Sequence, residues 1–318
     1  MNDSNRPGHL PHLGLLRFAG PDALSFLQGQ LSNDTNRLGA GAPLLAAYST
    51  PQGRVAAILH LLPHSSGVLA ILPREIVLPT LERLRKYVLR AKVRIEDVSE
   101  QLAVFGRLGS EGSATGTLPA PDAGPGYGES NGVAVARVGA DRDRSWVVGS
   151  AQDLATLGIA GDPVLEPRTA LAWRLADIRA GLPQIYAATR EMFVAQMLNL
   201  DLIDGISFTK GCFTGQEIIA RTQHLGRIKR RLHRLRLPAG TWAVGQTVHL
   251  TDGRSGRLTE LAAVGPEFEA LAVLNLESGG AAGAGGAAAA EDLADAGEAQ
   301  HSLIEATELP LPYSLAPP

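Results

Sequence analysis

The chain has 318 residues, of which 45% are hydrophobic and 19% charged, with a net charge of −3. These values are typical of a soluble protein of two or three domains, and the small net charge does not by itself indicate a nucleic-acid partner. The first eight residues lack the apolar segment of a signal peptide, and no apolar run approaches the roughly 18 residues of a membrane span. One cysteine, Cys212, cannot form an internal disulfide or supply a complete metal or cluster site, so we expect a cytoplasmic protein without a membrane partner.

The first two thirds of the chain mix strands with helices. Residues 1–12 are predicted to be a disordered leader, and residues 13–226 a module of two intertwined α+β subdomains. Helices are expected over about 21–31, 79–91 and 168–180, the third with Leu171, Leu175 and Ile178 inward. It should end at Gly181, because glycine there and proline just beyond are typical of a helix terminus. Strands are expected over 13–18, 55–62, 133–138 and 145–148.

Residues 227–318 carry the signals of a small antiparallel β-barrel. Short strand-like runs are separated by turns at residues 238–240, 252–253 and 265–266. Residues 278–300 are almost entirely Gly, Ala and acids, which predicts a flexible loop. A dinucleotide fingerprint superficially fits residues 283–288, but no βαβ unit precedes it, so we do not expect a nucleotide there.

The segment from Lys210 to Arg221 is the densest local signal. Thr214 followed by Glu217 forms a capping box, which predicts a helix from about Gly215. Cys212 would then lie just before a helix N-terminus, where positive partial charge favours an anion and lowers a thiol pKa. The alternative from the residues alone is a well-capped helix with a packed, inert cysteine.

This segment resembles the signature of the YgfZ family, which is related to the glycine-cleavage aminomethyltransferase (GcvT-like). Further segments carry the same resemblance, so that it spans about residues 13–318. They are residues 26–34, 87–93, 178–183, 193–201, 205–208 and 309–313.

The resemblance implies an α+β fold of three subdomains around a central folate pocket, the last a β-barrel. It implies binding of tetrahydrofolate or a one-carbon derivative, and support of iron–sulfur enzymes, including those that modify tRNA. Iron–sulfur client proteins are then the expected partners, with tRNA bound only indirectly or weakly. The resemblance does not settle whether any reaction is catalysed.

Candidate site residues follow from the chemistry of such a ligand. Cys212, with Lys210 beside it, is the candidate for catalysis or for thiol contact with a client. Trp173 is the candidate wall for a pteridine ring, which prefers an aromatic surface, although a core tryptophan is an equal alternative. Lys210 or Arg221 could pair with a folate carboxylate. Amide and carboxyl candidates, each also a possible structural hydrogen-bonding group, are Gln28, Gln30, Gln196, Gln216 and Glu217.

Two departures argue against glycine-cleavage chemistry. Arg179 stands where folate-using transferases of this fold commonly carry an acid, and residues 72–75 show no counterpart of their catalytic aspartate. We therefore keep a folate-dependent aminomethyl or methyl transferase only as an alternative to a folate-binding support protein. A scaffold with a vestigial folate site is a further alternative.

The basic tract from Arg221 to Arg236 leaves another alternative open. It could bind RNA, or it could be a barrel strand with one solvated face. His60 and His64 are separated by Pro63, which makes a helical metal-ligand pair improbable.

Overall fold

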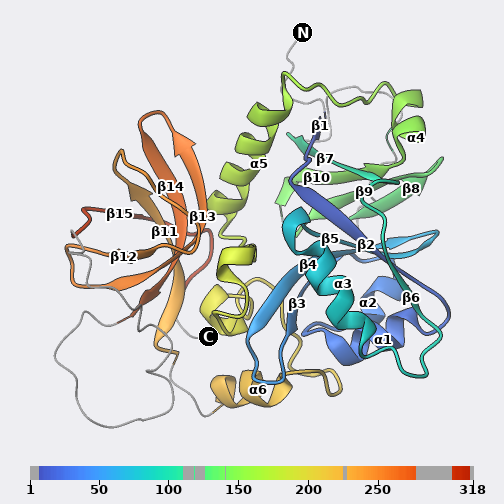
Figure 1. The fold of residues 1–318 in the computed structure, drawn as a ribbon, viewed down its shortest axis with the longest axis horizontal. Coiled ribbons are helices and arrows are strands. Elements are labelled where there is room, and N and C mark those ends of the chain that lie inside the picture. Colours follow the sequence, from blue (N-terminus) through green and yellow to red (C-terminus); the bar gives the residue numbers. More distant parts are fainter. Residues whose placement is uncertain are drawn as a thin grey trace.

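The computed structural model describes residues 7–109, 118, 126–139, 141–224, 228–276 and 303–315. Its strands form three antiparallel five-stranded sheets, which we call the N-terminal, middle and C-terminal sheets. Figure 1 shows the long helix α5 standing between the C-terminal sheet on one side and the other two sheets on the other. The predicted α+β class is confirmed, because helices accompany three antiparallel sheets.

The N-terminal sheet has helices on one face and the middle sheet on the other. Along β2, Leu16 and Phe18 pack into the core under the helices, whereas Leu13 and Leu15 pack against the middle sheet. This is the period-2 alternation that a strand buried on both faces produces. The strands, in sheet order, are β3 (Leu44–Ser49), β4 (Val55–His64), β5 (Gly67–Pro73), β2 (Leu13–Ala19) and β6 (Arg94–Asp97). The helices are α1 (Ala23–Gln30), α2 (Asn36–Gly39) and α3 (Val77–Arg85).

The middle sheet begins inside the segment expected to be a leader. Gly8 and His9 pair with β7, and Leu10 is fully buried, so the chain is ordered from residue 7. The leader prediction was wrong for residues 7–12 because an apolar side chain anchors them; residues 1–6 lie outside the described part. The strands, in sheet order, are β1 (Gly8–His9), β7 (Ala103–Leu108), β10 (Asp141–Gly149), β9 (Val133–Val138) and β8 (Tyr127–Ser130), with α4 (Ala151–Thr156) following β10.

Helix α5 (Glu166–Ala180) joins the sheets through ion pairs. Asp177 pairs with Arg144 of the middle sheet at 2.6 Å, and Arg174 lies 3.3 Å from Glu260 of the C-terminal sheet. As predicted, the helix ends at Gly181, whose φ of 64° is left-handed. Leu171, predicted to face inward, is 39% exposed, because a helix that contacts several sheets does not bury one continuous stripe.

The C-terminal sheet is open in the described residues, so the closed barrel is not observed. Its edge strands, β12 and β15, approach each other through a single bridge between Leu250 and Ile304. One bridge does not make the continuous ladder that closure requires. The strands, in sheet order, are β12 (Thr247–His249), β13 (Ser255–Val264), β14 (Glu267–Asn275), β11 (Arg230–Leu237) and β15 (Thr307–Leu309). The expected loop 278–300 lies outside the described residues.

Two further helix predictions can be compared with the structure. Helix α3 ends at Arg85, six residues before the predicted end, because the chain turns there toward β6. Helix α6 (Gln216–His224) begins one residue after the predicted position. Short 3-10 helices cover Arg74–Ile76, Ala187–Thr189 and Ala195–Leu198.

Candidate functional site

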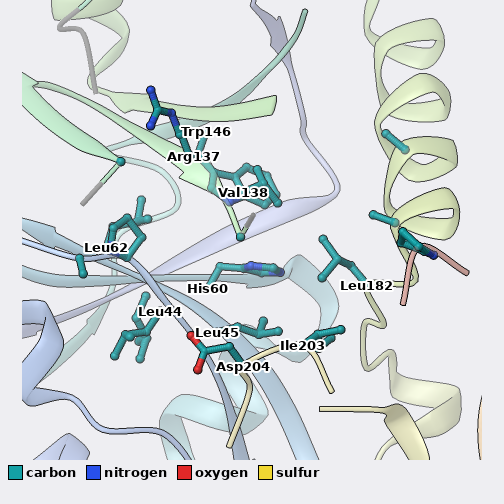
Figure 2. Close-up of a pocket in the computed structure, with 18 of the residues that line it drawn as sticks. Leu44, Leu45, His60, Leu62, Arg137, Val138, Trp146, Leu182, Ile203 and Asp204 are labelled. Atoms are coloured by element: carbon teal, nitrogen blue, oxygen red, sulfur yellow. The ribbon is translucent and has the colours of Figure 1, made fainter. Parts of the chain in front are cut away.

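A cavity of about 1390 Å³ lies where the N-terminal sheet, the middle sheet and α5 meet. Its walls are mainly aliphatic, and Figure 2 shows Leu44 and Leu45 on one side of His60, with Val138 and Trp146 on another. The segments that contribute are β3, β4, β9, β10, α5, residues 202–204 and residues 312–313. Because these segments are far apart in sequence, only the assembled fold creates the cavity.

Three adjoining rings, tilted relative to one another, back one wall of the cavity. The rings of His60 and Trp146 lie 5.3 Å apart, and those of Trp146 and Trp173 lie 4.4 Å apart. His60 and Trp146 line the cavity, whereas Trp173 is fully buried one layer behind them. Burial lowers the pKa of His60 to about 4, so its ring is neutral near pH 7 and offers one donor and one acceptor.

Three arginines stand among the lining residues. Arg179 pairs with Glu269 through its Nη2 at 2.8 Å, and this pairing raises the pKa of Arg179. Arg37 pairs with Asp204 at 2.8 Å on the rim. Arg137 of β9 is the third. An otherwise apolar cavity thus carries guanidinium groups, which bind carboxylates in a fork geometry.

The C-terminal tail covers the end of α5 beside the cavity. The Tyr313 hydroxyl donates to the Gly181 carbonyl at 2.8 Å, and Asn199 Nδ2 donates to the same hydroxyl at 3.4 Å. A Cβ at Gly181 would lie 2.5 Å from the Tyr313 oxygen. Glycine is therefore required there twice, by its positive φ and by this close approach.

The loop that carries Cys212 is fixed to α1 by one side chain. Lys210 Nζ donates to the carbonyls of Gln28, Leu31 and Asn33 at 2.7, 2.6 and 2.9 Å. A lysine in this place satisfies carbonyls that a helix leaves unpaired at its C-terminus. Burial lowers the pKa of Lys210 to about 8. Lys210 thus clamps the loop, and its amine points at backbone rather than at solvent.

Cys212 itself is exposed in this clamped loop. The Thr214 hydroxyl donates to Gln30 Oε1 at 3.4 Å, and the Thr214 N–H donates to the Gly29 carbonyl. The loop therefore has further contacts with the end of α1. The helix that follows, α6, holds Gln216 half-buried, with Glu217 and Arg221 exposed. Cys212 therefore lies in an exposed loop just before α6, as the sequence predicted.

None of the residues predicted from the sequence to bind the cofactor lines the cavity. Gln28 bonds Asp34 and Thr35 next to α1, Gln30 meets Thr214, and Gln196 is fully buried with its Nε2 donating to the Ile219 carbonyl. Trp173 comes nearest, as the ring behind Trp146.

The cavity residues that sequence reasoning missed lack a local motif. Trp146 lies in a short apolar strand, and His60 was weighed only as a metal ligand. Arg179 was noted, but only as a departure from the transferase pattern. The alternation of side chains along β10 could have indicated that Trp146 is buried, because it places Trp146 and Val148 on the same face of the strand, toward the N-terminal sheet.

The basic tract is largely neutralised where the structure describes it. Arg231 is buried in an ion pair with Asp201 at 2.6 Å, Arg234 pairs with Glu269, His233 with Glu308 and Arg236 with Glu267. Leu235 and Leu237 are buried on the other face, so the strand interpretation is confirmed for β11. Residues 225–227 lie outside the described part.

The described residues offer neither a metal-ligand cluster nor a membrane-spanning helix. No group of three or more His, Cys, Asp or Glu side chains is placed there to hold a metal ion. None of the helices in that part of the chain has both the length and the apolar character needed to cross a bilayer.

Comparison with known proteins gives both sequence relatives and a structural neighbour. No family model matches the chain. It is 31% identical over 227 residues to the tRNA-modifying protein YgfZ of Colwellia psychrerythraea, covering 70% of this chain and 69% of that protein. It is 32% identical over 222 residues to the tRNA-modifying protein YgfZ of Pectobacterium carotovorum, covering 69% and 66%. It is also 33% identical over 220 residues to an uncharacterized protein of Haemophilus influenzae, covering 69% of both.

The structure is similar to that of the glycine cleavage system aminomethyltransferase T from Bartonella henselae. The TM-score is 0.57 at 14% sequence identity, and the match covers 86% of this chain and 79% of that one. At this identity the likeness concerns the fold alone.

Proposed function

This chain belongs to the YgfZ family, and on that premise we propose that it binds a reduced folate in the central cavity and supports tRNA modification. The observation that carries the proposal is the cavity itself. Its volume of about 1390 Å³ exceeds the roughly 300–1,000 Å³ of most small-molecule sites, so the cavity has room for a ligand of folate size. Aliphatic walls, a ring stack and arginines are all present in one space.

The wall formed by His60 and Trp146 suits a pteridine ring. A flat heterocycle gains from an aromatic and aliphatic surface and needs a few donors and acceptors on its edge. Gln184 Nε2 donates to His60 Nε2 at 2.9 Å, so the neutral His60 ring keeps its Nδ1–H as the donor that it can supply. The residues present therefore fit the ring of a folate.

The arginines suit the other end of the same ligand. A folate ends in glutamate carboxylates, and the side chain of the lining residue Arg179 is 52% exposed. Its present partner is Glu269. We propose that a folate carboxylate competes with Glu269 for Arg179, an exchange of one ion pair for another of the same kind.

The proposal stops at binding and support, short of an aminomethyl transfer. Arg179 stands where the resemblance places the transferase acid, and it is engaged by Glu269. Glu75 is the acid within residues 72–75, and its Oε1 accepts the Ala187 N–H. A reaction that needs an acid at either place has no support in this arrangement.

We place the protein's wider role in the cytoplasm, in the maintenance of iron–sulfur enzymes that modify tRNA. The relatives from Colwellia psychrerythraea and Pectobacterium carotovorum are named as tRNA-modifying proteins, which supports the link to tRNA modification. Exposed Cys212, on a loop held by Lys210, supports a contact with a client protein. In this proposal folate is the cofactor, and RNA reaches the protein weakly or through its clients.

Titration calorimetry with tetrahydrofolate tests the binding step. Ala176 lies on α5 and lines the cavity, so Ala176→Trp should fill the cavity and weaken binding at least tenfold. Ala170 lies on the same helix in a shallow groove elsewhere, so Ala170→Trp is the matched control and should bind like the unmodified protein. Saturable binding that neither substitution changes would contradict the location, and absence of binding would contradict the proposal.

A further inference from the structure

The connection between α3 and β6 carries an unusual concentration of positive charge. Residues 83–94 contain six of the chain's 29 Lys and Arg residues and no acid, although the whole chain is slightly acidic. None of them lines the cavity. Figure 1 shows this connection at the edge of the molecule, beside α1. We call residues 83–94 the basic segment.

Three of the six charges of the basic segment point to solvent, whereas Arg83 and Arg94 pair with Glu191 and Glu96 and Arg85 donates to the Ile95 carbonyl. The side chains of Lys86, Arg90 and Lys92 are exposed and make no hydrogen bond or ion pair with the described residues. Two large apolar side chains are exposed among them, Tyr87 at 39% and Leu89 at 86%. Like charges repel, so unpaired cations that share one short segment do not stabilise the fold and are available to an anionic partner.

The backbone of the basic segment is held in place from beneath. Val88, Ala91 and Val93 pack against the main core. The Asp22 carboxylate accepts the Lys92 N–H at 2.6 Å, and the Asp22 N–H donates to the Lys92 carbonyl at 3.4 Å. The exposed charges therefore stand on a fixed scaffold, which lowers the entropy lost when a partner binds.

We infer that the basic segment binds the phosphate backbone of RNA, with Tyr87 placed to stack on a base. Cations gathered on one short connection release counterions from a polyanion, and an exposed ring adds a stacking surface. The paired arginines of β11 offer neither feature, since acids already neutralise them. The inference rests on the proposed function for the choice of RNA, because an anionic lipid surface would also attract these charges.

The position of the basic segment relative to Cys212 agrees with this assignment. Helix α1 touches both regions: Asp22, just before its start, holds Lys92, and its C-terminal carbonyls hold Lys210. A helix of eight residues is about 12 Å long. An RNA lying on the basic segment would thus pass within reach of a client protein at the Cys212 loop.

Fluorescence anisotropy with a labelled, unmodified tRNA transcript tests the inference. The test variant is Lys86→Glu, Arg90→Glu and Lys92→Glu combined. The control is Arg168→Glu, Lys229→Glu and Arg236→Glu combined, which changes the net charge by the same amount at exposed sites elsewhere. We expect weak binding by the unmodified protein, at least a tenfold loss in the test variant, and a salt slope that is lower by about 2 to 3. Tyr87→Ala should weaken binding about fivefold or more.

Each other outcome overturns the inference. Equal losses of tRNA affinity in the two triple variants would show an effect of net charge alone. Absence of tRNA binding by the unmodified protein would show that the basic segment is not an RNA-binding surface. Binding to phosphatidylserine vesicles but not to tRNA would assign the segment to membranes. Tetrahydrofolate titration of the same variants separates the two proposals, since folate binding should persist in the test triple. If circular dichroism shows that this triple is unfolded, the Gln replacements at the same three positions take its place.

Discussion

The central cavity and the Cys212 loop are built in opposite ways. The cavity takes its walls from the N-terminal and middle sheets, α5 and the C-terminal tail, and the aromatic rings behind one wall are buried. The loop is one short run of sequence, held at the surface by the three hydrogen bonds of Lys210. A region enclosed by many elements suits a small ligand that must be surrounded, whereas an exposed reactive group suits a partner that comes and goes.

This difference indicates that the cavity and the Cys212 loop have separate roles. No residue from 210 to 221 lines the cavity, so the loop does not act on a folate seated there in the present conformation. Helix α1 holds the loop through its C-terminal carbonyls, and α5 holds the cavity through its ion pairs to two sheets. Substitutions should therefore affect one region and spare the other.

The largest effect on stability is expected at Trp173. This ring is fully buried against Trp146, so Trp173→Ala should lower the free energy of unfolding by about 3–5 kcal/mol. Urea denaturation measures the loss. If Trp173→Ala kept its stability but lost its affinity for folate, Trp173 would have to contact the ligand directly, and this prediction would be wrong.

A pH-dependent effect is expected where α5 meets the C-terminal sheet. Burial raises the pKa of Glu260 to about 7 from a usual 4.5, and Tyr186 donates to its carboxyl at 2.7 Å. A raised carboxyl pKa means that the folded state holds the proton more tightly, so stabilisation present at low pH is lost as pH rises from about 4.5 through about 7. Relative to Glu260→Gln, the unmodified protein should lose roughly 3 kcal/mol over this window. Thermal unfolding at pH 5 and pH 8 compares the two, and parallel curves would contradict the prediction.

A smaller effect is expected at Lys210. Replacement by methionine keeps the stem but removes the three donors, leaving carbonyls of the α1 C-terminus without partners. We expect a loss of about 2 kcal/mol in unfolding free energy, with folate affinity unchanged. Lys229→Met, at an exposed site, is the control and should change stability little. Loss of folate binding without loss of stability would return Lys210 to a role in ligand chemistry.

The smallest effect on stability is expected at Cys212. Its side chain is exposed, so Cys212→Ala should shift the unfolding free energy by less than about 0.5 kcal/mol and leave folate binding intact. The same variant should fail to support iron–sulfur enzyme activity in cells that lack the native protein. Full iron–sulfur enzyme activity in cells that carry Cys212→Ala would contradict the proposed role of the thiol. Cys212→Ser provides a second test of the same role.

Elements with strong local signals could be predicted from the sequence. Gly181 ended a helix as expected because its left-handed conformation needs glycine, and α6 began close to Gly215. The strand alternation of β11 was likewise readable from Leu235 and Leu237. Each of these depends on residues close together in the chain.

The candidate site could be predicted only in part, because it depends on contacts across the chain. The target carbonyls of Lys210 lie about 180 residues away, so its clamping role has no local signature. Trp146 and Trp173 are equivalent as sequence signals, and only packing makes one a lining residue and the other its support. The leader failed as a prediction for a similar reason, since Leu10 finds its core partners in β7 and α5.

The most direct test of the central claim is a crystal structure of the protein with tetrahydrofolate. We predict electron density for the pteridine ring against His60 and Trp146, with a glutamate carboxylate near Arg179. Density beside Cys212 at the start of α6, with the cavity left to solvent, would contradict the separation of the folate site from the Cys212 loop.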